Sequence, residues 1–134
     1  QIILIGVHKN GYTLAEKINK ELKQISNSSI ELTSIKINKK NPSEEIELDC
    51  KKEYLKNKAI VLVDDVLHTG KTLIYCVKHL LEIIPKNFNT VVLIDRNHKK
   101  FPIKVDFKGI SLSTFISDHV EVVFEDNNSY AFIK

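Results

Sequence analysis

The sequence is short of several residue types, and each shortage excludes a class of protein. It has no methionine, no tryptophan and only two cysteines, Cys50 and Cys76, which form no metal-binding or redox motif. Such sparse cysteine favours a protein kept reduced in the cytoplasm. No apolar run approaches the roughly 18 residues that a membrane-spanning helix needs, and no secretory signal pattern is visible. We therefore expect no membrane partner.

Arginine is scarce as well, because Arg96 is the only arginine among the 20 basic residues. The formal net charge of +3 is too small a bias to argue for a nucleic-acid partner. Arginine suits planar, bidentate contacts with phosphate better than lysine does. The place of this single arginine is therefore of interest.

What is present suits one globular domain. The 134 residues are 43% hydrophobic and 28% charged, which is ordinary for a domain with its own core. We expect a single domain over residues 1–134. Because the chain has no methionine and begins inside an apolar, strand-like run, we also expect that it lacks an N-terminal segment.

The apolar pattern predicts strands that alternate with helices. It predicts strands at 1–6, 30–37, 59–63 and 90–94, and helices at 12–24 and 73–84. This alternation predicts an α/β fold in which helices flank a doubly wound, mostly parallel sheet. Beyond residue 105 we expect short strands and turns. Residues 38–54 are polar around a short strand expected at 46–48, and form either a functional lid or a solvated loop.

Polar residues follow three of these strands, at His8-Lys9, Asp64-Asp65 and Asp95-Arg96. The carboxyl ends of parallel strands meet at one edge of a sheet, which is where ligands bind in open α/β folds. We therefore expect these three loops to form one site.

The richest segment runs from Ala59 to Thr72. The strand-like run 59–63 is followed by Asp64 and Asp65, expected at the strand end and outside the core, and then by the turn Thr69-Gly70-Lys71-Thr72, which opens a helix. Carboxylates accept hydrogen bonds from sugar hydroxyls, and the free amides of a helix start suit a phosphate. A phosphorylated sugar needs both.

Two other interpretations compete for this segment. A strand, an acidic turn and a capped helix without any ligand would give the same pattern. Gly70-Lys71-Thr72 also matches the end of a Walker nucleotide-binding loop, but that motif needs a glycine five residues before Gly70, where Asp65 stands. A carboxylate there would repel a triphosphate, which disfavours the Walker interpretation.

The segment resembles the fingerprint of type I phosphoribosyltransferases, which bind 5-phosphoribosyl-1-pyrophosphate (PRPP). The match comprises two acids, three spacer residues, a Thr-Gly and a Thr after a hydrophobic strand. The resemblance implies that Asp64 and Asp65 hold the ribose 2- and 3-hydroxyls, and that they hold Mg²⁺ mostly through PRPP and water. It also implies a PRPP-binding turn made of His68, Thr69, Gly70, Lys71 and Thr72.

The similarity covers nearly all of the chain. His8, Lys9, Asn10 and Gly11 stand in the family's pyrophosphate loop, where a non-proline cis peptide is common. We expect that bond between His8 and Lys9, with Gly11 supplying backbone freedom to enter the next helix and Lys9 as the side chain for pyrophosphate. Residues 33–54 stand in the flexible lid, and the C-terminal strands form a small hood.

Residues 95–109 resemble one subgroup, the bifunctional pyrimidine-operon attenuator and uracil phosphoribosyltransferase, with its Asp-Arg-Gly-His, Pro-Ile-Arg and Asp-Tyr-Val-Gly segments. Purine-salvage relatives carry an aspartate where His68 stands and a lysine where Asp95 stands, so both positions disfavour a 6-oxopurine. An exposed turn histidine is the other interpretation of His68. Arg96 is expected either to contact pyrophosphate or to pair with a carboxylate of the site.

The sequence also departs from the subgroup. Lys9-Asn10-Gly11 replaces Thr-Arg-Gly in the pyrophosphate loop, and Lys71 replaces an arginine. Ser113 and Thr114 replace a Pro-Thr-Ser pattern in the base-reading segment, so they are candidates for the vicinity of the base and the pyrophosphate.

Two functions follow from the resemblance. The first is a magnesium-dependent enzyme, in solution a homo-oligomer such as a dimer, that transfers the phosphoribosyl group of PRPP to a nucleobase, with uracil favoured. The alternative is a regulator that binds messenger RNA and uses the PRPP pocket as a nucleotide sensor.

Overall fold

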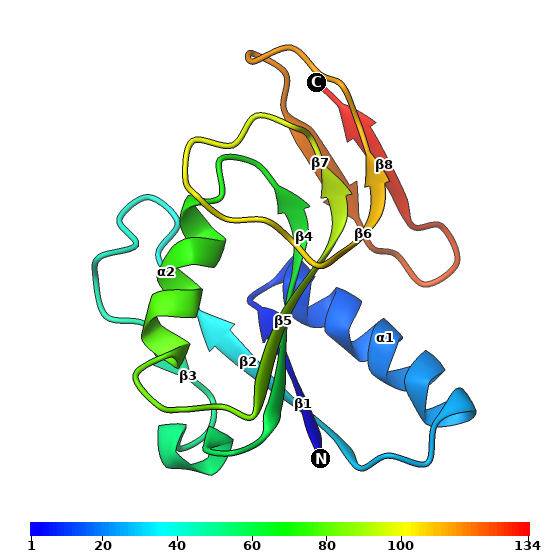
Figure 1. Cartoon of the computed structure of the whole chain (residues 1–134). Helices are drawn as coiled ribbons and strands as arrows, with labels where there is room; N and C mark the ends of the chain where they lie inside the picture. Colours follow the sequence, from blue (N-terminus) through cyan, green and yellow to red (C-terminus); the bar gives the residue numbers. More distant parts are fainter.

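The computed structural model describes residues 1–134 and has two sheets and two α-helices (Figure 1). The elements, in chain order, are β1 (Ile2–Val7), α1 (Asn10–Ile25), β2 (Ile30–Lys36), β3 (Glu47–Leu48), the 3₁₀ turn η1 (Lys52–Leu55), β4 (Ala59–Leu67), α2 (Lys71–Leu80), β5 (Asn87–Asp95), β6 (Phe107–Ser111), β7 (Val120–Val123) and β8 (Tyr130–Ile133). Neither helix is long and apolar enough to cross a bilayer.

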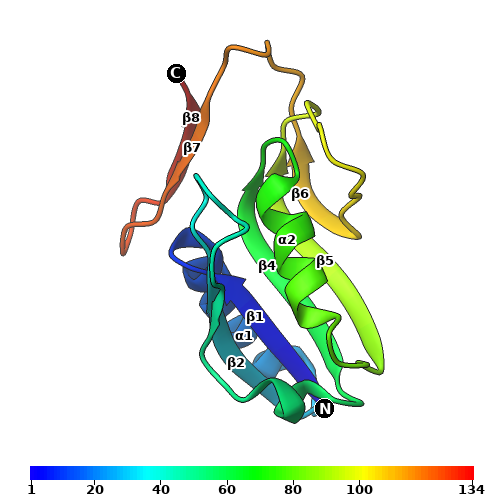
Figure 2. The same ribbon diagram turned by 90° about the vertical axis from the view of Figure 1, so that its left-hand side faces the viewer.

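The main sheet has the order β3-β2-β1-β4-β5-β6, and all its strands except β3 run parallel. Helix α1 covers one face and α2 the other (Figure 1). The predicted α/β fold with a mostly parallel sheet is thus confirmed. Strands β7 and β8 form a separate antiparallel pair within the hood, residues 112–134, which stands above the sheet edge (Figure 2).

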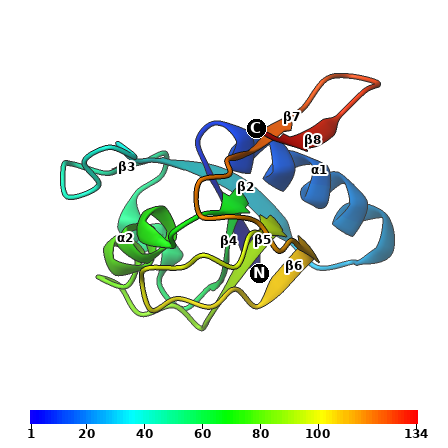
Figure 3. The same cartoon turned by 90° about the horizontal axis from the view of Figure 1, so that it is seen from above.

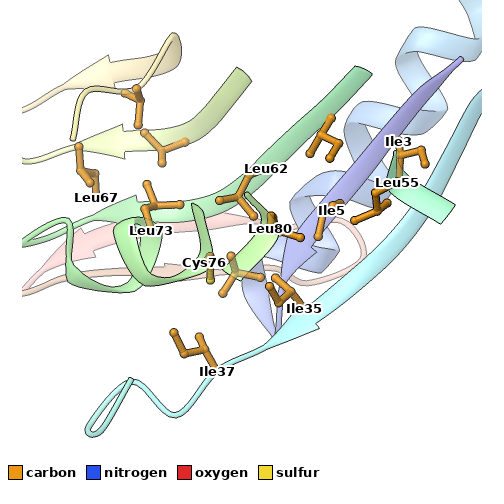
Figure 4. Packing of buried hydrophobic residues seen from close by; sticks show 14 residues of the cluster. Ile3, Ile5, Ile35, Ile37, Leu55, Leu62, Leu67, Leu73, Cys76 and Leu80 are labelled. Atoms are coloured by element: carbon orange, nitrogen blue, oxygen red, sulfur yellow. The ribbon is translucent and has the colours of Figure 1, made fainter. Parts of the chain in front are cut away.

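The central strands are buried on both faces because each face packs against a helix. In β1, Ile3 and Ile5 point into the cluster under α2, while Leu4 packs against Leu14 and Ala15 of α1. This period-two alternation explains why parallel strands appear in the sequence as continuous apolar runs. Figure 4 shows the α2-side cluster, where side chains of the strands meet those of the helix.

Three predicted boundaries differ from the structure by three residues or more. Strand β4 continues four residues beyond Val63, because β5 goes on pairing with it up to Leu67. Strand β5 begins at Asn87 rather than at residue 90 for the same reason. Helix α2 ends at Leu80 instead of residue 84, since the Ile84 carbonyl accepts the amide of Asn57 and the backbone leaves the helix to reach it.

The polar segment 38–54 is partly ordered by the sheet. The short strand predicted at 46–48 is present as β3, which pairs antiparallel with the end of β2. Leu55, at the end of η1, is fully buried in the α2-side cluster. The lid is therefore a loop held at both of its ends, by Ile37 before it and by Leu55 after it.

Candidate functional site

The carboxyl ends of β1, β4 and β5 lie at one edge of the sheet, as the sequence predicts. Figure 3 looks down on this edge, with α1 and α2 on opposite sides of the strand ends. The segments at the ends of the three strands, residues 8–9, 64–72 and 95–98, are therefore neighbours in space although they are far apart in the chain.

The turn before α2 borders a small cavity. The cavity measures about 60 Å³ and is lined by Lys39, Asp64, Val66, Leu67, His68, Thr69, Gly70, Lys71, Thr72 and Leu73. Pockets for whole small molecules measure about 300 Å³ or more, so this one fits a group of the size of a phosphate.

Gly70 fixes the shape of that turn. Its φ of 88° lies in the left-handed region that favours glycine, and an added Cβ would lie 2.6 Å from Cγ2 of Ile103. The N-cap residue Gly70 has no side chain to cap α2, and the first turn holds no acidic residue, so the amides that follow Lys71 remain available to an anion. The Thr69 hydroxyl accepts a hydrogen bond from the Lys71 amide at 3.3 Å, which closes the turn.

Asp64 is a buried residue of β4 and only 2% exposed, so the expectation that it lies outside the core is wrong. Its side chain accepts a hydrogen bond from the Asp65 amide at 2.9 Å. Burial raises the pKa of the Asp64 carboxyl to about 7, against the opposing pull of the Lys39 charge. A carboxyl with such a pKa exchanges its proton readily near neutral pH, and a cation that binds beside it favours its ionised form.

Asp65 is half-buried, and its side chain contacts Asn10 at the start of α1. Its carboxylate accepts a hydrogen bond from the side-chain amide of Asn10 at 3.1 Å. The same amide donates to the Val122 carbonyl of β7 at 2.8 Å. Asn10 thereby joins the second acidic residue of the motif to the hood.

The predicted pyrophosphate loop is shorter than expected, because Asn10 and Gly11 already form the first turn of α1. An added Cβ on Gly11 would lie 2.6 Å from the Val63 carbonyl oxygen, so glycine serves the close approach of α1 to β4 rather than freedom of the backbone. His8 and Lys9 are exposed, and the bond between them is cis, which confirms the predicted cis peptide. Like α2, α1 has no side-chain cap and no acidic residue in its first turn.

Asp95 and Arg96 are both buried at the end of β5. The Asp95 carboxylate accepts the Asn97 amide at 2.9 Å and lies 3.5 Å from the Lys108 ammonium. The Arg96 guanidinium donates to the carbonyls of Phe115 and Ile116 at 3.2 and 3.1 Å. It meets no carboxylate, so of its two expected contacts the pair with a site carboxylate is wrong, and the contact with pyrophosphate stays a prediction. Its two hydrogen bonds hold the hood loop.

The predicted base-reading residues lie in that loop. The Thr114 hydroxyl donates to the Arg96 carbonyl at 3.3 Å, and the Thr114 carbonyl is bonded to the His98 ring. Ser113 is exposed beside them. The structure thus brings Thr114 to the end of β5, where Arg96 lies.

His68 is half-buried rather than an exposed turn residue. Its ring stacks on that of His119 with centroids 4.9 Å apart and planes 6° from parallel. Burial, together with the neighbouring charges of His119 and Arg96, lowers the pKa of His68 to about 4. Sequence analysis did not single out His119, nor Lys39 in the cavity, because both come from segments distant in the chain.

The chain alone does not offer a complete metal site, since it has no cluster of three or more His, Cys, Asp and Glu side chains able to hold an ion. Asp64 and Asp65 supply two neighbouring carboxylates. Mg²⁺ characteristically takes one or two carboxylates and completes its octahedron with substrate phosphates and water. The donor set therefore fits an ion that arrives together with an oxygen-rich ligand.

Comparison with known proteins gives a consistent result. A family model described as the phosphoribosyl transferase domain matches residues 1–127. Two curated proteins, both named bifunctional protein PyrR, are similar. That of Ligilactobacillus salivarius is 31% identical over 93% of this chain and 76% of its own length, and that of Fusobacterium nucleatum is 34% identical over 93% and 75%.

Solved structures share the fold. A variant of the hypoxanthine phosphoribosyltransferase from Trypanosoma cruzi, complexed with the product IMP, superposes with a TM-score of 0.74 at 19% identity and covers 84% of this chain. A hypoxanthine-guanine phosphoribosyltransferase from Bacillus anthracis gives 0.67 at 18% identity over 83% of this chain. The chain spans only 55% and 64% of the lengths of those two structures. The resemblance seen in the sequence is thus confirmed over most of its length, and the chain belongs to the phosphoribosyl transferase domain family.

Proposed function

We propose that the chain is an enzyme that binds PRPP and transfers its phosphoribosyl group to uracil, with release of pyrophosphate. One observation carries the proposal: Asp64 and the start of α2, which follows the left-handed Gly70, line the same phosphate-sized cavity. Acceptors for sugar hydroxyls and donors for a phosphate thereby lie side by side, as a phosphorylated sugar requires.

In the proposed complex each part of PRPP meets one element. The amides and hydroxyls of residues 69–72 hold the 5-phosphate at the start of α2. Asp64 and Asp65 accept hydrogen bonds from the two ribose hydroxyls. The exposed residues His8 and Lys9 and the uncapped start of α1 receive the pyrophosphate, with the Lys9 ammonium as its counter-charge.

Catalysis in this scheme is positioning and charge stabilisation. A ring nitrogen of the base forms a bond to C1 of the ribose and gives up its proton, while the bond from C1 to the pyrophosphate oxygen breaks. Positive charge develops on the ribose ring, and the carboxylates of Asp64 and Asp65 lie where they stabilise it. Bound Mg²⁺ supplies neutralisation of the leaving pyrophosphate. The lid keeps water away from the reacting carbon.

Uracil is the base that the sequence favours. Asp95 stands where purine-salvage relatives have a lysine. Its carboxylate accepts the Asn97 amide and lies beside the Lys108 ammonium, and as an acceptor it has no proton to donate to a purine oxygen. His68 stands where those relatives carry an aspartate. Residues 95–109 resemble the pyrimidine-operon attenuator and uracil phosphoribosyltransferase subgroup.

A screen of nucleobases tests the proposal. The protein is incubated with PRPP, Mg²⁺ and uracil, cytosine, hypoxanthine or guanine, and pyrophosphate release is measured. We expect turnover with uracil and little with either purine. If the protein turned over hypoxanthine or guanine but not uracil, the proposed base would be wrong. If calorimetry detected no binding of PRPP, the proposed reaction class would be wrong.

A regulator that binds RNA is the second candidate. Three lysines, Lys56, Lys58 and Lys86, line a cavity of about 490 Å³ at the opposite edge of the sheet. Lysines gathered on one surface suit the RNA backbone, and such binding weakens steeply with salt. Replacing all three with glutamine should abolish salt-dependent RNA binding and leave PRPP consumption unchanged if this candidate is right.

A further inference from the structure

One residue of the lid reaches the phosphate-sized cavity. Of the ten residues that line this cavity, nine come from the segment 64–73 and the tenth is Lys39. Lys39 is separated from the rest by more than twenty positions of the chain. The lid therefore contributes a single, positively charged side chain to a site otherwise built from one strand, one turn and one helix start.

Local structure fixes the position of Lys39. Ile37, two residues earlier, is only 7% exposed and packs in the α2-side cluster with Leu73 and Cys76 (Figure 4). Asn38 folds the next residues into a turn, since its side-chain oxygen accepts the amides of Lys40 and Asn41 at 3.0 and 3.3 Å. As a result Lys39 lines the cavity and Lys40 does not.

The lid is held by hydrogen bonds of its own. The side-chain amide of Asn38 donates to Glu44 at 2.9 Å, and that of Asn41 donates to the same carboxylate at 3.0 Å. Residues 42–46 face Tyr75 and other residues of α2 across a second cavity. The turn that carries Lys39 is thus held by the buried Ile37 before it and by these internal hydrogen bonds after it.

The charges around the cavity leave Lys39 available to an anion. Lys39 forms no ion pair within 4 Å, because the four ion pairs of the chain involve other residues. Its charge nevertheless acts on the cavity wall, where it lowers the pKa values of both Asp64 and His68. The start of α2 and a lysine without an ion pair thus line the same cavity, which suits a doubly charged phosphate ester.

We propose that Lys39 is a phosphate-binding residue that the lid contributes to the turn at the start of α2. A phosphate ester in the cavity is held by residues 69–72 and by the Lys39 ammonium. Binding then ties the lid to the phosphate turn, so a ligand that carries only this phosphate already orders the lid. The inference rests on the proposed function, because it requires that a sugar phosphate binds in this turn.

The test compares Lys39→Gln with Lys40→Gln, which removes the same charge from the adjacent residue, exposed like Lys39 but outside the cavity lining. Ribose 5-phosphate and PRPP are titrated by calorimetry. We expect Lys39→Gln to lower the affinity for ribose 5-phosphate about tenfold, the usual effect of losing one charge-assisted hydrogen bond. Lys40→Gln should change this affinity less than about twofold. Lys39→Arg should restore most of the affinity, since it keeps the charge and the reach.

Hydrogen exchange gives a second readout. If Lys39 had only a structural role, its replacement would not change the effect of the ligand on exchange in the lid. Ribose 5-phosphate should slow exchange in residues 38–46 in the unaltered protein and in Lys40→Gln, but not in Lys39→Gln. Equal affinities in the two glutamine variants, with unaltered binding of PRPP, would overturn the role of Lys39 and leave the proposed function standing. If the unaltered protein binds neither ribose 5-phosphate nor PRPP, both proposals are wrong.

Discussion

The two sides of the candidate site are built in different ways. The phosphate side, residues 59–73, is one continuous piece of chain that runs from β4 through a turn into α2. The hood side consists of residues 95–98 and the hood, and its contacts join distant positions, such as Arg96 with Phe115 and Asn10 with Val122. One side is thus formed by local structure and the other by tertiary contacts.

The two sides also differ in how firmly they are anchored. Leu62, Leu67 and Leu73 of the phosphate side belong to a cluster of 14 buried residues. The hood rests on a cluster of only four, to which it contributes Val120 and Val122. Local stability follows buried apolar contacts, so we expect the phosphate side to be rigid and the hood to open first. Ligand binding should therefore begin with the phosphate.

The largest effect should come from the second acid of the phosphate side. Asp65→Ala should lower PRPP affinity by at least about 100-fold, because hydrogen bonds to a charged group contribute about 1.5–3 kcal/mol each and a sugar diol makes two. Calorimetry measures the loss. Asp126→Ala removes an exposed acid of the hood and serves as the control. Unchanged PRPP affinity in Asp65→Ala would mean that the acidic pair does not hold the sugar.

Arg96→Ala should separate the two sides. Arg96 is 7% exposed and its guanidinium donates to two carbonyls of the hood loop, so its loss should cost about 2–4 kcal/mol of stability. Hydrogen exchange should accelerate at least tenfold in residues 112–134 and remain slow in β1 and β4. PRPP affinity should stay within about threefold, while the KM for the base rises. If β1 and β4 lost protection to the same extent, the two sides would be one cooperative unit.

The same contrast explains how much of the molecule the sequence could predict. Ala59 to Thr72 is one strand, turn and helix start, so apolar periodicity and spacing were enough to predict these elements. The ligand roles of Asp64, Gly70 and Thr72 came from the family resemblance and stay a prediction. His119 offers no such local signal, because its partner His68 lies 51 positions earlier. Whether Arg96 bonds a ligand, a carboxylate or a hood carbonyl depends on how the chain returns over the sheet, and no local pattern encodes that.

Burial of Asp64 was missed for a related reason. The strand was predicted to end at Val63 because the apolar run ends there, but the pairing of β5 with β4 continues past both acids. A polar residue thus lies within a buried strand, and only the neighbouring strand determines this. Asp64 and Asp65 were predicted as equivalent acids at the strand end, whereas in the structure Asp64 is buried and Asp65 is half-buried.

Asp64→Asn should change the pH dependence of stability. The folded pKa of about 7 lies above the ordinary value of 3.8, so the favourable contribution of the protonated form is complete below about pH 4 and is lost as the pH rises to 7. Relative to the unaltered protein, the variant should therefore gain stability over this range, by up to about 1.4 kcal/mol per pH unit. Urea midpoints at pH 4, 5.5 and 7.5 measure the difference.

His68→Phe provides the opposite sign as a control. The pKa of His68 is lowered to about 4 from 6.5, so its neutral form contributes fully above pH 6.5 and that contribution is lost as the pH falls to 4. The phenylalanine variant should gain stability relative to the unaltered protein at low pH, whereas Asp64→Asn gains at high pH. Parallel pH profiles in all three proteins would show that neither group is buried as described.

The smallest effect should come from the ring stack where the two sides touch. His119→Ala removes a stacking contact of about 1 kcal/mol, so the KM for uracil should rise a few-fold with PRPP affinity unchanged. His68 would then be more hydrated and free of the neighbouring ring, so its pKa should rise from about 4 towards 6.5, which NMR titration follows. His119→Phe should keep the stack and most of the KM. If the pKa of His68 did not change in His119→Ala, burial by the phosphate side alone would account for the low pKa. The hood would then not affect the titration of His68.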